Sequence, residues 1–557
     1  MTGPFADTRP FSHITRRENL ERLHYETFDL LVIGGGITGT AIARDAALRG
    51  FHTALVEKAD FASGTSSRSS RLIHGGVRYL EFHQFGLVYE ASTERYRLRR
   101  IAPRLVSPLP FLYPVYGTGT GLLKLALGLW LYDILGLFRN VQRHRTLGAH
   151  RVARREPFLA RRGLKGAVRY YDAAVDDARL TLLTAKAAHH AGAVVVNHAP
   201  AIALLRSGQR IVGAIVRDAR TGREIEVQAR LVVNAAGPWV DAIRRMSDSP
   251  PPMLRPTKGA HLILPWERVP TQHAIVFDSP RDGRHLFLIP WGEFAILGTT
   301  DTDYSGDPEM VAADAWDVAY LLEAAQRAFP TARLSEADIV STYAGLRPLI
   351  AQEAASTYAI SREHHIEETA PGLLTIAGGK LTTHRLMAEE LVDRAAQMLA
   401  EQFGIQAAHP CMTARLRLDG TPIRSPLNWP LPTAFRPVDV PVPEKSLRHV
   451  TRTYGPEAAR ILAYVEENPS LGQPLLPHRP YLLAEIPYAV KHEMAQTLSD
   501  FLIRRTHVIY EDRDGGLAVA PQVADRMAAL LGWDEAEKAR QLRDYQAQVA
   551  LTRVSER

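Results

Sequence analysis

Three glycines at positions 34, 36 and 39 have the spacing of a dinucleotide-binding turn. In such a turn the first glycine permits the tight bend, the second lets the backbone approach a pyrophosphate, and the third lets a helix pack on a strand. The free N–H groups at the start of that helix would bind phosphate oxygens. Glu57 lies 23 residues after Gly34, where a carboxylate accepts hydrogen bonds from ribose hydroxyls and repels a 2′-phosphate. These residues predict an ADP-containing dinucleotide site and leave FAD and NAD undecided.

A second polar block follows at residues 65–80 (TSSRSSRLIHGGVRYL). Five hydroxyl side chains among six residues, followed by a Gly-Gly pair, offer many hydrogen-bond donors and a backbone that can approach a flat ring. His74 could titrate near neutral pH, and Arg78 could bind an anion through its guanidinium group. The alternative interpretation is a polar loop that contains a structural histidine.

The third block is Gly378-Gly379-Lys380, which follows the apolar residues 373–377. The pattern predicts a strand, a tight turn and the start of a helix. That helix dipole could face a ligand that gains negative charge, such as a flavin on reduction, and Lys380 would add a full positive charge. A second phosphate-binding turn or a plain helix start is the alternative.

Short apolar runs and turn residues predict the elements that position these blocks. Residues 30–33, 41–48 and 53–57 read as strand, helix and strand within about 30 residues, which is a β-α-β unit. Further strands are expected at 194–196, 211–216, 225–227, 231–234, 285–291 and 294–298. Seven prolines between 422 and 443 predict an extended linker, and helical patterning dominates from 445 to 557. Arg504 and Arg505 in that last region are expected to be surface charges on a packing helix. The alternative is that they support dimer contacts or close over the substrate domain.

The composition is that of an ordinary globular protein with several domains. The chain has 557 residues, 46% of them hydrophobic and 23% charged, so collagen-like and wholly disordered classes are excluded. A single cysteine, Cys411, excludes a disulfide framework and a multi-cysteine metal site, and we predict no metal. Residues 1–27 contain no apolar run of signal-peptide length, and we interpret them as a cytoplasmic N-terminal extension.

The net charge of +7 is concentrated in one segment. Residues 139–165 contain nine basic residues and one acid, so the rest of the chain is nearly neutral. The apolar residues 119–138 precede this segment, but Lys124 and Asp133 interrupt them and argue against a membrane span. An apolar helix next to arginines predicts an interfacial anchor on anionic lipid. The alternative is a buried helix beside a solvated loop.

Nucleic-acid binding is disfavoured because Phe158 is the one aromatic residue in the basic segment.

Several longer motifs occur together and in a characteristic order. They are SSRSSRLIHGGVRYLE (66–81), VDDARL (175–180), NAAGPWV (234–240), KGAHLILP (258–265), LGTTDTDY (297–304), YAGLRPL (343–349), AISRE (359–363) and AGGKLTTHR (377–385). With them the chain resembles the FAD-dependent, respiratory, membrane-associated glycerol-3-phosphate dehydrogenases of bacteria. The resemblance covers residues 28–390 and continues more loosely through 481–506.

The resemblance implies a set of binding residues. FAD would be bound by Gly34, Gly36, Gly39, Glu57, Ser66, Ser67, Gly237, Gly378 and Gly379. The substrate would be sn-glycerol 3-phosphate, oxidised to dihydroxyacetone phosphate by hydride transfer to flavin N5. Its binding residues would be Arg78, Tyr79, His261, Arg347, Arg362 and Lys380. A phosphate dianion suits bidentate guanidinium donors.

The oxidation also requires that the substrate hydroxyl lose a proton, so a base or a stabilising cation is needed. Candidates are His74, His261, Lys380 and Arg347. We favour His74 as the proton acceptor, with Lys380 and Arg347 providing electrostatic stabilisation. His261 fits equally a wall of the substrate pocket and a core histidine.

The resemblance further implies the fold, the partners and the location. We expect a Rossmann-type FAD-binding domain (28–100, 165–240 and 355–410), a mixed-sheet substrate domain (101–164 and 241–354, with 119–165 facing a membrane), a linker (411–444) and a helical C-terminal cap domain (445–557). The enzyme would be a homodimer on the inner face of the cytoplasmic membrane, passing electrons to quinone. The alternatives are an oxidase that uses O2 and forms H2O2, a flavin-dependent protein that modifies nucleic acid, and a non-enzymatic FAD-binding scaffold.

Overall fold

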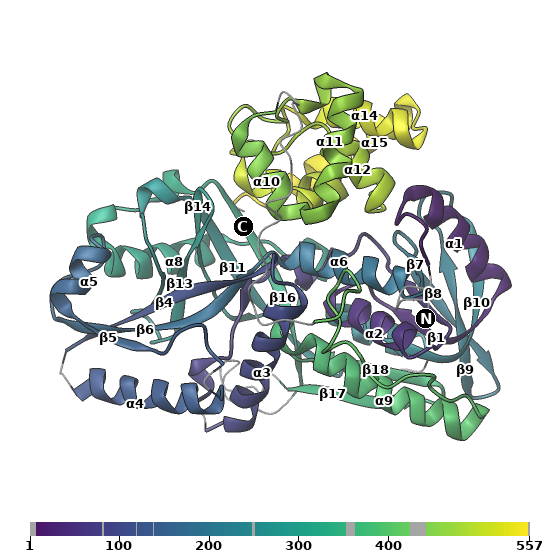
Figure 1. Ribbon diagram of the computed structural model, residues 1–557, viewed down its shortest axis with the longest axis horizontal. Helices are drawn as coiled ribbons and strands as arrows, with labels where there is room; N and C mark the ends of the chain where they lie inside the picture. Colours follow the sequence, from purple (N-terminus) through teal and green to yellow (C-terminus); the bar gives the residue numbers. More distant parts are fainter. Residues whose placement is uncertain are drawn as a thin grey trace.

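The computed structural model describes residues 7–80, 83–117, 120–137, 139–247, 251–351, 363–423 and 442–554, with the backbone alone for Arg78, Tyr79 and Thr120. Two sheets, called sheet A and sheet B here, lie side by side, and the C-terminal helices lie over the junction between them (Figure 1). The predicted α/β architecture with a helical C-terminal region is therefore observed.

Sheet A contains the first β-α-β unit. Its parallel core has the order β18-β10-β1-β2-β7, and β17, β9 and β8 extend it with antiparallel pairs. Leu30 to Ile33 are buried, as expected for a parallel strand covered on both faces. The strands of sheet A are β1 (Thr27–Ile33), β2 (Thr53–Val56), β7 (Val194–Val196), β8 (Ala201–Ser207), β9 (Arg210–Arg217), β10 (Glu224–Asn234), β17 (His364–Ala370) and β18 (Leu373–Gly378).

One strand of sheet A differs from the expected pattern. The sequence predicts separate strands at 225–227 and 231–234, whereas β10 runs without a break from Glu224 to Asn234. Its first half pairs with β9 and its second half with β1, so the polar residues between the two apolar runs still lie in a hydrogen-bonded ladder. Pairing with neighbouring strands thus keeps these polar residues in a strand, although their local sequence predicts a break.

Sheet B forms the other half of the molecule. In the described residues it has the order β15-β11-β14-β13-β12-β4-β6-β3, with β16 paired to β11 and β5 paired to β6. Its strands are β3 (Leu72–Ile73), β4 (Val106–Tyr116), β5 (Arg145–Gly148), β6 (Leu164–Val175), β11 (Leu254–Pro265), β12 (Ala274–Asp278), β13 (His285–Trp291), β14 (Phe294–Gly298), β15 (Thr302–Asp303) and β16 (Ser341–Ile350). Strands β3 and β6 fall within ranges expected for the FAD-binding domain, yet they pair in sheet B because β6 pairs with β4 along its whole length.

Helices cover both sheets. Helix α2 packs between α6 and α9 on sheet A, α1 packs on β7 and β10, and α4 packs on β4 and β6 of sheet B. The first twelve helices are α1 (His13–Tyr25), α2 (Ile37–Leu48), α3 (Phe85–Ile101), α4 (Thr120–Leu135), α5 (Ala149–Arg155), α6 (Asp177–His190), α7 (Val240–Arg244), α8 (Ala315–Ala328), α9 (His384–Phe403), α10 (Glu444–Tyr454), α11 (Ala458–Glu467) and α12 (Glu485–His492). Helices α13 (Val508–Glu511), α14 (Ala520–Leu531) and α15 (Glu535–Ala550) complete the described chain. None of the described helices is both long and apolar enough to cross a membrane.

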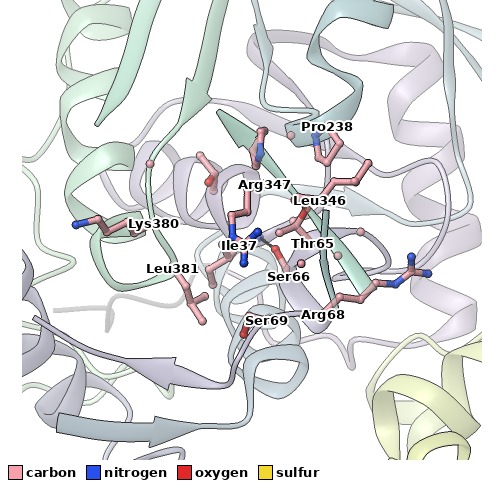
Figure 2. Close-up of a pocket in the computed structure, with 18 of the residues that line it drawn as sticks. Ile37, Thr65, Ser66, Arg68, Ser69, Pro238, Leu346, Arg347, Lys380 and Leu381 are labelled. Carbon is pink, nitrogen blue, oxygen red and sulfur yellow. Dashed lines mark hydrogen bonds between the residues drawn. The ribbon is translucent and has the colours of Figure 1, made fainter. Parts of the chain in front are cut away.

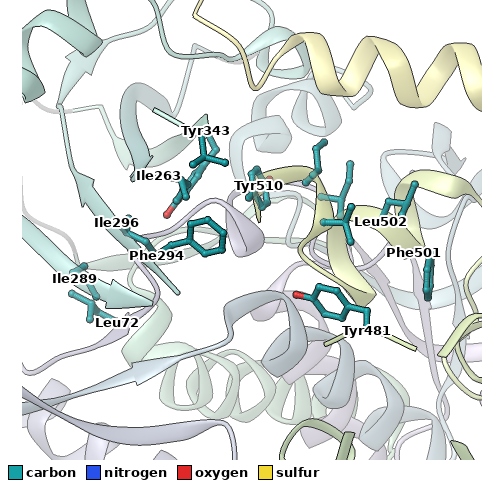
Figure 3. Close-up of a cluster of buried hydrophobic side chains, with 14 of the residues drawn as sticks. Leu72, Ile263, Ile289, Phe294, Ile296, Tyr343, Tyr481, Phe501, Leu502 and Tyr510 are labelled. Atoms are coloured by element: carbon teal, nitrogen blue, oxygen red, sulfur yellow. The ribbon is translucent and has the colours of Figure 1, made fainter. Parts of the chain in front are cut away.

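The C-terminal helices share a continuous apolar core with sheet B. Phe294, Ile296 and Tyr343 of the sheet lie in the same cluster as Phe501 and Tyr510 (Figure 3). Burial of this apolar surface provides the main driving force for docking the C-terminal region.

A buried ion-pair cluster joins the same region to sheet A. Asp60 accepts hydrogen bonds from Arg504 Nε at 2.7 Å and from Arg505 at 2.6 and 3.1 Å. All three side chains are buried, so the expectation that Arg504 and Arg505 are surface charges was wrong. Periodicity within one helix does not show which partner covers a charged face.

We predict that Asp60→Asn lowers the free energy of unfolding by about 3 kcal/mol, because it leaves two buried guanidinium groups without their shared carboxylate. The matched control is Asp525→Asn, whose carboxylate pairs with Lys538 at the surface and whose loss should change the free energy of unfolding by less than about 0.5 kcal/mol. Urea denaturation followed by circular dichroism measures both. Equal stability of the two variants would contradict the role assigned to the cluster.

Candidate active site

One cavity of about 540 Å³ lies between the two sheets. It is lined by residues at the carboxyl ends of β1, β2 and β18 and by residues of β4, β6, β11, β13 and β16. Strand order in sheet A reverses at β1, and open α/β sheets bind ligands in the crevice at such a point. A cavity of this volume is in the range of small-molecule and cofactor sites.

The glycine turn lies at one end of this cavity. Gly34 has φ +116°, and a Cβ there would stand 2.5 Å from the Ala235 carbonyl oxygen at the end of β10. A Cβ on Gly39 would stand 1.9 Å from the Gly34 oxygen, so α2 lies directly against the turn. The first amide of α2, Ile37 N–H, donates to Ser66 Oγ at 2.9 Å. The close approach that a pyrophosphate site requires is thus present.

Glu57 is held at the end of β2 beside this turn. Its carboxylate accepts hydrogen bonds from the N–H groups of Gly35 at 2.6 Å and Ala59 at 2.9 Å. Burial raises the pKa of Glu57. The side chain lines the cavity, where it is available to ribose hydroxyls. The glycine turn and this carboxylate together fit the adenosine diphosphate half of a dinucleotide.

The other predicted cofactor residues divide into two groups. Ser66, Gly237, Gly378 and Gly379 line the cavity together with Gly34, Gly36 and Glu57. Ser67 does not, because it is buried and its hydroxyl donates to the Ala62 carbonyl at 2.7 Å. The sequence of the hydroxyl-rich residues 65–70 does not show which of their hydroxyl groups face the cavity.

His261 is a buried wall of the cavity. Its Nε2 lies 2.8 Å from Ser70 Oγ, and its ring stacks on Tyr343 with centroids 4.6 Å apart. Burial, followed by the charges of Arg347 and Arg71, lowers the pKa of His261 to about 3. Among the described residues Nδ1 has no hydrogen-bond partner. The imidazole is therefore neutral at physiological pH, and both of its ring nitrogens are covered by neighbouring residues.

Arg347 of β16 is fixed by a dense set of acceptors. Its guanidinium donates to Asp301 Oδ1 and Thr299 Oγ1 at 3.1 Å each, and to backbone oxygens of Lys258 and Thr300. Arg284 pairs with the same Asp301 at 3.2 Å. Arg284 also pairs with Asp282 at 3.3 Å, and the guanidinium groups of Arg284 and Arg347 both line this wall of the cavity. Sequence reasoning missed Asp301, Arg284 and Ser70, although Asp301 lies within the LGTTDTDY motif.

His74 and Lys380 come from two neighbouring loops that border the cavity. The His74 N–H donates to Thr382 Oγ1 at 3.2 Å, and the Thr382 hydroxyl lies 3.2 Å from the His74 carbonyl oxygen. Figure 2 shows Arg347 near the middle of the view and Lys380 extending to one side. The side chains of Arg78 and Tyr79 and the whole of Arg362 lie outside the described residues.

The cavity therefore combines a dinucleotide turn, a neutral histidine, a second histidine and a wall that carries two guanidinium groups. A two-sheet fold with such a site is typical of a nucleotide-dependent oxidoreductase. The model of the family described as "FAD dependent oxidoreductase" matches residues 29–394, and that of the "C-terminal domain of alpha-glycerophosphate oxidase" matches residues 374–538.

Curated relatives carry a more specific name. "Glycerol-3-phosphate dehydrogenase 2" of Mycobacterium tuberculosis is 40% identical over 95% of this chain and 89% of its own length. "Aerobic glycerol-3-phosphate dehydrogenase" of Staphylococcus saprophyticus is 36% identical over 95% of this chain and 96% of its own. The crystal structure of the glycerol-3-phosphate dehydrogenase from Bacillus halodurans complexed with FAD has a TM-score of 0.76 and 31% identity, covering 97% of this chain and 98% of that one.

The chain belongs to the FAD-dependent oxidoreductases and, within them, to the glycerol-3-phosphate dehydrogenase family. The predicted family, fold class and FAD cofactor are confirmed.

We predict that Gly39→Ala abolishes FAD retention, because the added methyl group would collide with the Gly34 oxygen and push α2 away from the turn. Gly86→Ala, at an exposed helical glycine with open space around its Cβ, is the matched control and should keep its flavin. The ratio of absorbance at 450 and 280 nm in the purified proteins measures the cofactor content. Full occupancy in Gly39→Ala would show that the turn does not carry the pyrophosphate.

Proposed function

We propose that this protein oxidises sn-glycerol 3-phosphate to dihydroxyacetone phosphate with FAD and passes the electrons to a membrane quinone. The observation that carries the proposal is the convergence of His74, His261 and Arg347 on one cavity with the dinucleotide turn. The names of the curated relatives support the choice of substrate.

The guanidinium groups on the cavity wall favour an anionic substrate. The rigid Arg347 guanidinium, backed by Arg284 and Asp301, attracts a phosphate dianion more strongly than a neutral polyol. Because Arg347 is already held by several acceptors, little side-chain entropy is lost when the substrate binds. From the family resemblance, Arg78, Tyr79 and Arg362 complete the phosphate site. Lys380 borders the cavity, and its positive charge adds to that of the arginines.

His74 and His261 have different roles in the proposed reaction. Bound FAD supplies the acceptor for the hydride that leaves the secondary carbon. His74 accepts the proton of the secondary hydroxyl at a ring nitrogen. His261 is kept neutral by its surroundings and forms a wall of the substrate pocket. A buried histidine whose pKa is about 3 is a poor proton acceptor at neutral pH, and this favours His74 as the base.

We predict that His74→Ala retains FAD and slows anaerobic flavin reduction by sn-glycerol 3-phosphate about 100-fold, in the range expected for loss of a general base. His365→Ala is the matched control, because His365 is exposed on β17 and pairs with Glu367. Stopped-flow absorbance at 450 nm gives both rates. Near-normal reduction by His74→Ala would remove His74 from the proposed mechanism.

A membrane attachment is proposed from the exposed face of α4. Leu127 is 60% exposed and Trp130 46% exposed, and Leu123, Leu131 and Ile134 lie on the same face. The basic segment 139–165 follows directly, and eight of its nine basic side chains are exposed. Asp133 is buried and hydrogen-bonded to His144, so it does not interrupt the exposed apolar face. This combination suits the surface of an anionic bilayer, in which quinone is dissolved. The proposed homodimer rests on family resemblance alone.

We predict that Trp130→Glu abolishes sedimentation with anionic vesicles and quinone-dependent turnover while anaerobic flavin reduction is retained. The matched control, Trp316→Glu, changes an equally exposed tryptophan on α8 and should leave both unchanged. High salt should release the wild-type protein from the vesicles. Undiminished vesicle binding by Trp130→Glu would contradict the attachment.

Turnover with O2 that matches turnover with quinone would favour the oxidase alternative.

A further inference from the structure

The hydroxyl group of Tyr132 on α4 reaches from the surface helix to the loop that carries His74. Tyr132 is fully buried, although the opposite face of its helix is exposed. Its hydroxyl donates to Asp172 Oδ1 at 2.7 Å and accepts from Arg95 at 2.6 Å and from the Gly75 N–H at 3.1 Å. Asp172 also accepts from Gly75 N–H at 3.2 Å and pairs with Arg95.

Neighbouring side chains leave no room for a side chain at Gly75. A Cβ on Gly75 would stand 2.3 Å from the Tyr132 hydroxyl and 2.5 Å from Ser92 Oγ on α3. On the other side of the loop, Thr382 brackets the backbone of His74. His74 and Gly76 both line the cavity. The loop is thus clamped between Thr382 on one side and Tyr132 with Asp172 on the other.

We propose that Tyr132, with Asp172 and Arg95, is a positioning residue that sets the orientation of the His74 loop and thereby the rate of substrate oxidation. The inference deepens the proposed function and rests on the role given there to His74. It makes a helix at the molecular surface part of the catalytic apparatus.

The charges around Tyr132 fix the direction of its hydrogen bonds. Burial raises the pKa of the phenol well above its ordinary value, so the group stays protonated and has one hydrogen to donate. Asp172 is the acceptor for that hydrogen, and Arg95 neutralises the buried carboxylate. The remaining lone-pair capacity of the hydroxyl faces Gly75 N–H. Loss of the hydroxyl would leave Asp172 as the single acceptor for this amide.

The clamp is continuous with the segment beyond α4. Arg95 also donates to Asn140 Oδ1, Asn140 donates to Asp133, and His144 lies 2.7 Å from the second Asp133 oxygen. Both Asp133 and Arg95 are buried. The start of the basic segment therefore supports the same guanidinium group that supports Asp172. A hydrogen-bond network of this kind holds its members more firmly than isolated pairs do.

The test compares Tyr132→Phe with Tyr116→Phe. Tyr116 is an exposed tyrosine of β4 whose hydroxyl donates to the Ala160 carbonyl oxygen. Tyr116→Phe therefore removes a hydrogen-bonded hydroxyl in the same way, but at a site away from the His74 loop. Hydrogen exchange should be faster in peptides that contain Gly75 in Tyr132→Phe and unchanged in Tyr116→Phe. Anaerobic flavin reduction at saturating sn-glycerol 3-phosphate should slow by about tenfold or more, since small displacements of catalytic groups have such effects. FAD content and the dissociation constant of the substrate should change less than about twofold, because the ring still fills its site.

Asp172→Asn is a second variant that keeps the side-chain shape. Because it also removes the carboxylate that pairs with the buried Arg95, we expect a lower free energy of unfolding together with faster exchange at Gly75 and slower flavin reduction. Wild-type exchange at Gly75 together with wild-type reduction in Tyr132→Phe would overturn the inference. A reduction rate that falls only in proportion to FAD content would also overturn it, since a purely structural role predicts that result. If sn-glycerol 3-phosphate fails to reduce even the wild-type flavin, the proposed function fails, and unchanged Gly75 exchange in Tyr132→Phe would separately refute the clamp.

Discussion

The active site depends on hydrogen bonds that hold residues 57–76, a segment with little regular structure of its own. Such a segment must satisfy its polar groups with partners from other elements. Each part of the molecule provides such partners. Arg505 of the C-terminal region donates to Asp60, Tyr343 of β16 donates to the Ser69 carbonyl oxygen, and Asp177 of α6 accepts from the Ser69 hydroxyl. His261 of β11 is hydrogen-bonded to Ser70, Thr382 accepts from the His74 N–H, and Tyr132 of α4 accepts from the Gly75 N–H. The two sheets and the C-terminal helices thus converge on one segment.

This convergence explains how a cavity between two sheets keeps a defined geometry. Glu57 at the start of the segment bonds the glycine turn, and His74 near its end lines the same cavity. The C-terminal helices do not line the main cavity in the described residues, yet Arg504 and Arg505 fix the segment through Asp60. The electrostatic pattern follows from the same packing, because burial keeps His261 neutral while Arg347 retains its charge beside Asp301.

Local sequence patterns were sufficient for the nucleotide half of the site. The strand at 30–33, the glycine spacing and Glu57 form one contiguous unit whose geometry follows from short-range rules, and the structure places them as expected. Long-range contacts were not accessible in this way. The inward turn of Ser66 but not Ser67, the sharing of Asp301 by Arg284 and Arg347, and the burial of Arg504 each depend on elements far away in the chain. The merging of two predicted strands into β10 also arises from long-range contacts, because β10 pairs with both β9 and β1.

If sn-glycerol 3-phosphate is the electron donor, its phosphate group is required for reduction of the flavin. The most direct test is an anaerobic titration of the FAD-loaded protein, followed by flavin absorbance and by quantification of the ketone product. The account predicts that sn-glycerol 3-phosphate bleaches the flavin with equimolar formation of dihydroxyacetone phosphate, whereas glycerol at the same concentrations leaves the spectrum unchanged. Equal bleaching by glycerol, or no bleaching by sn-glycerol 3-phosphate, would contradict it.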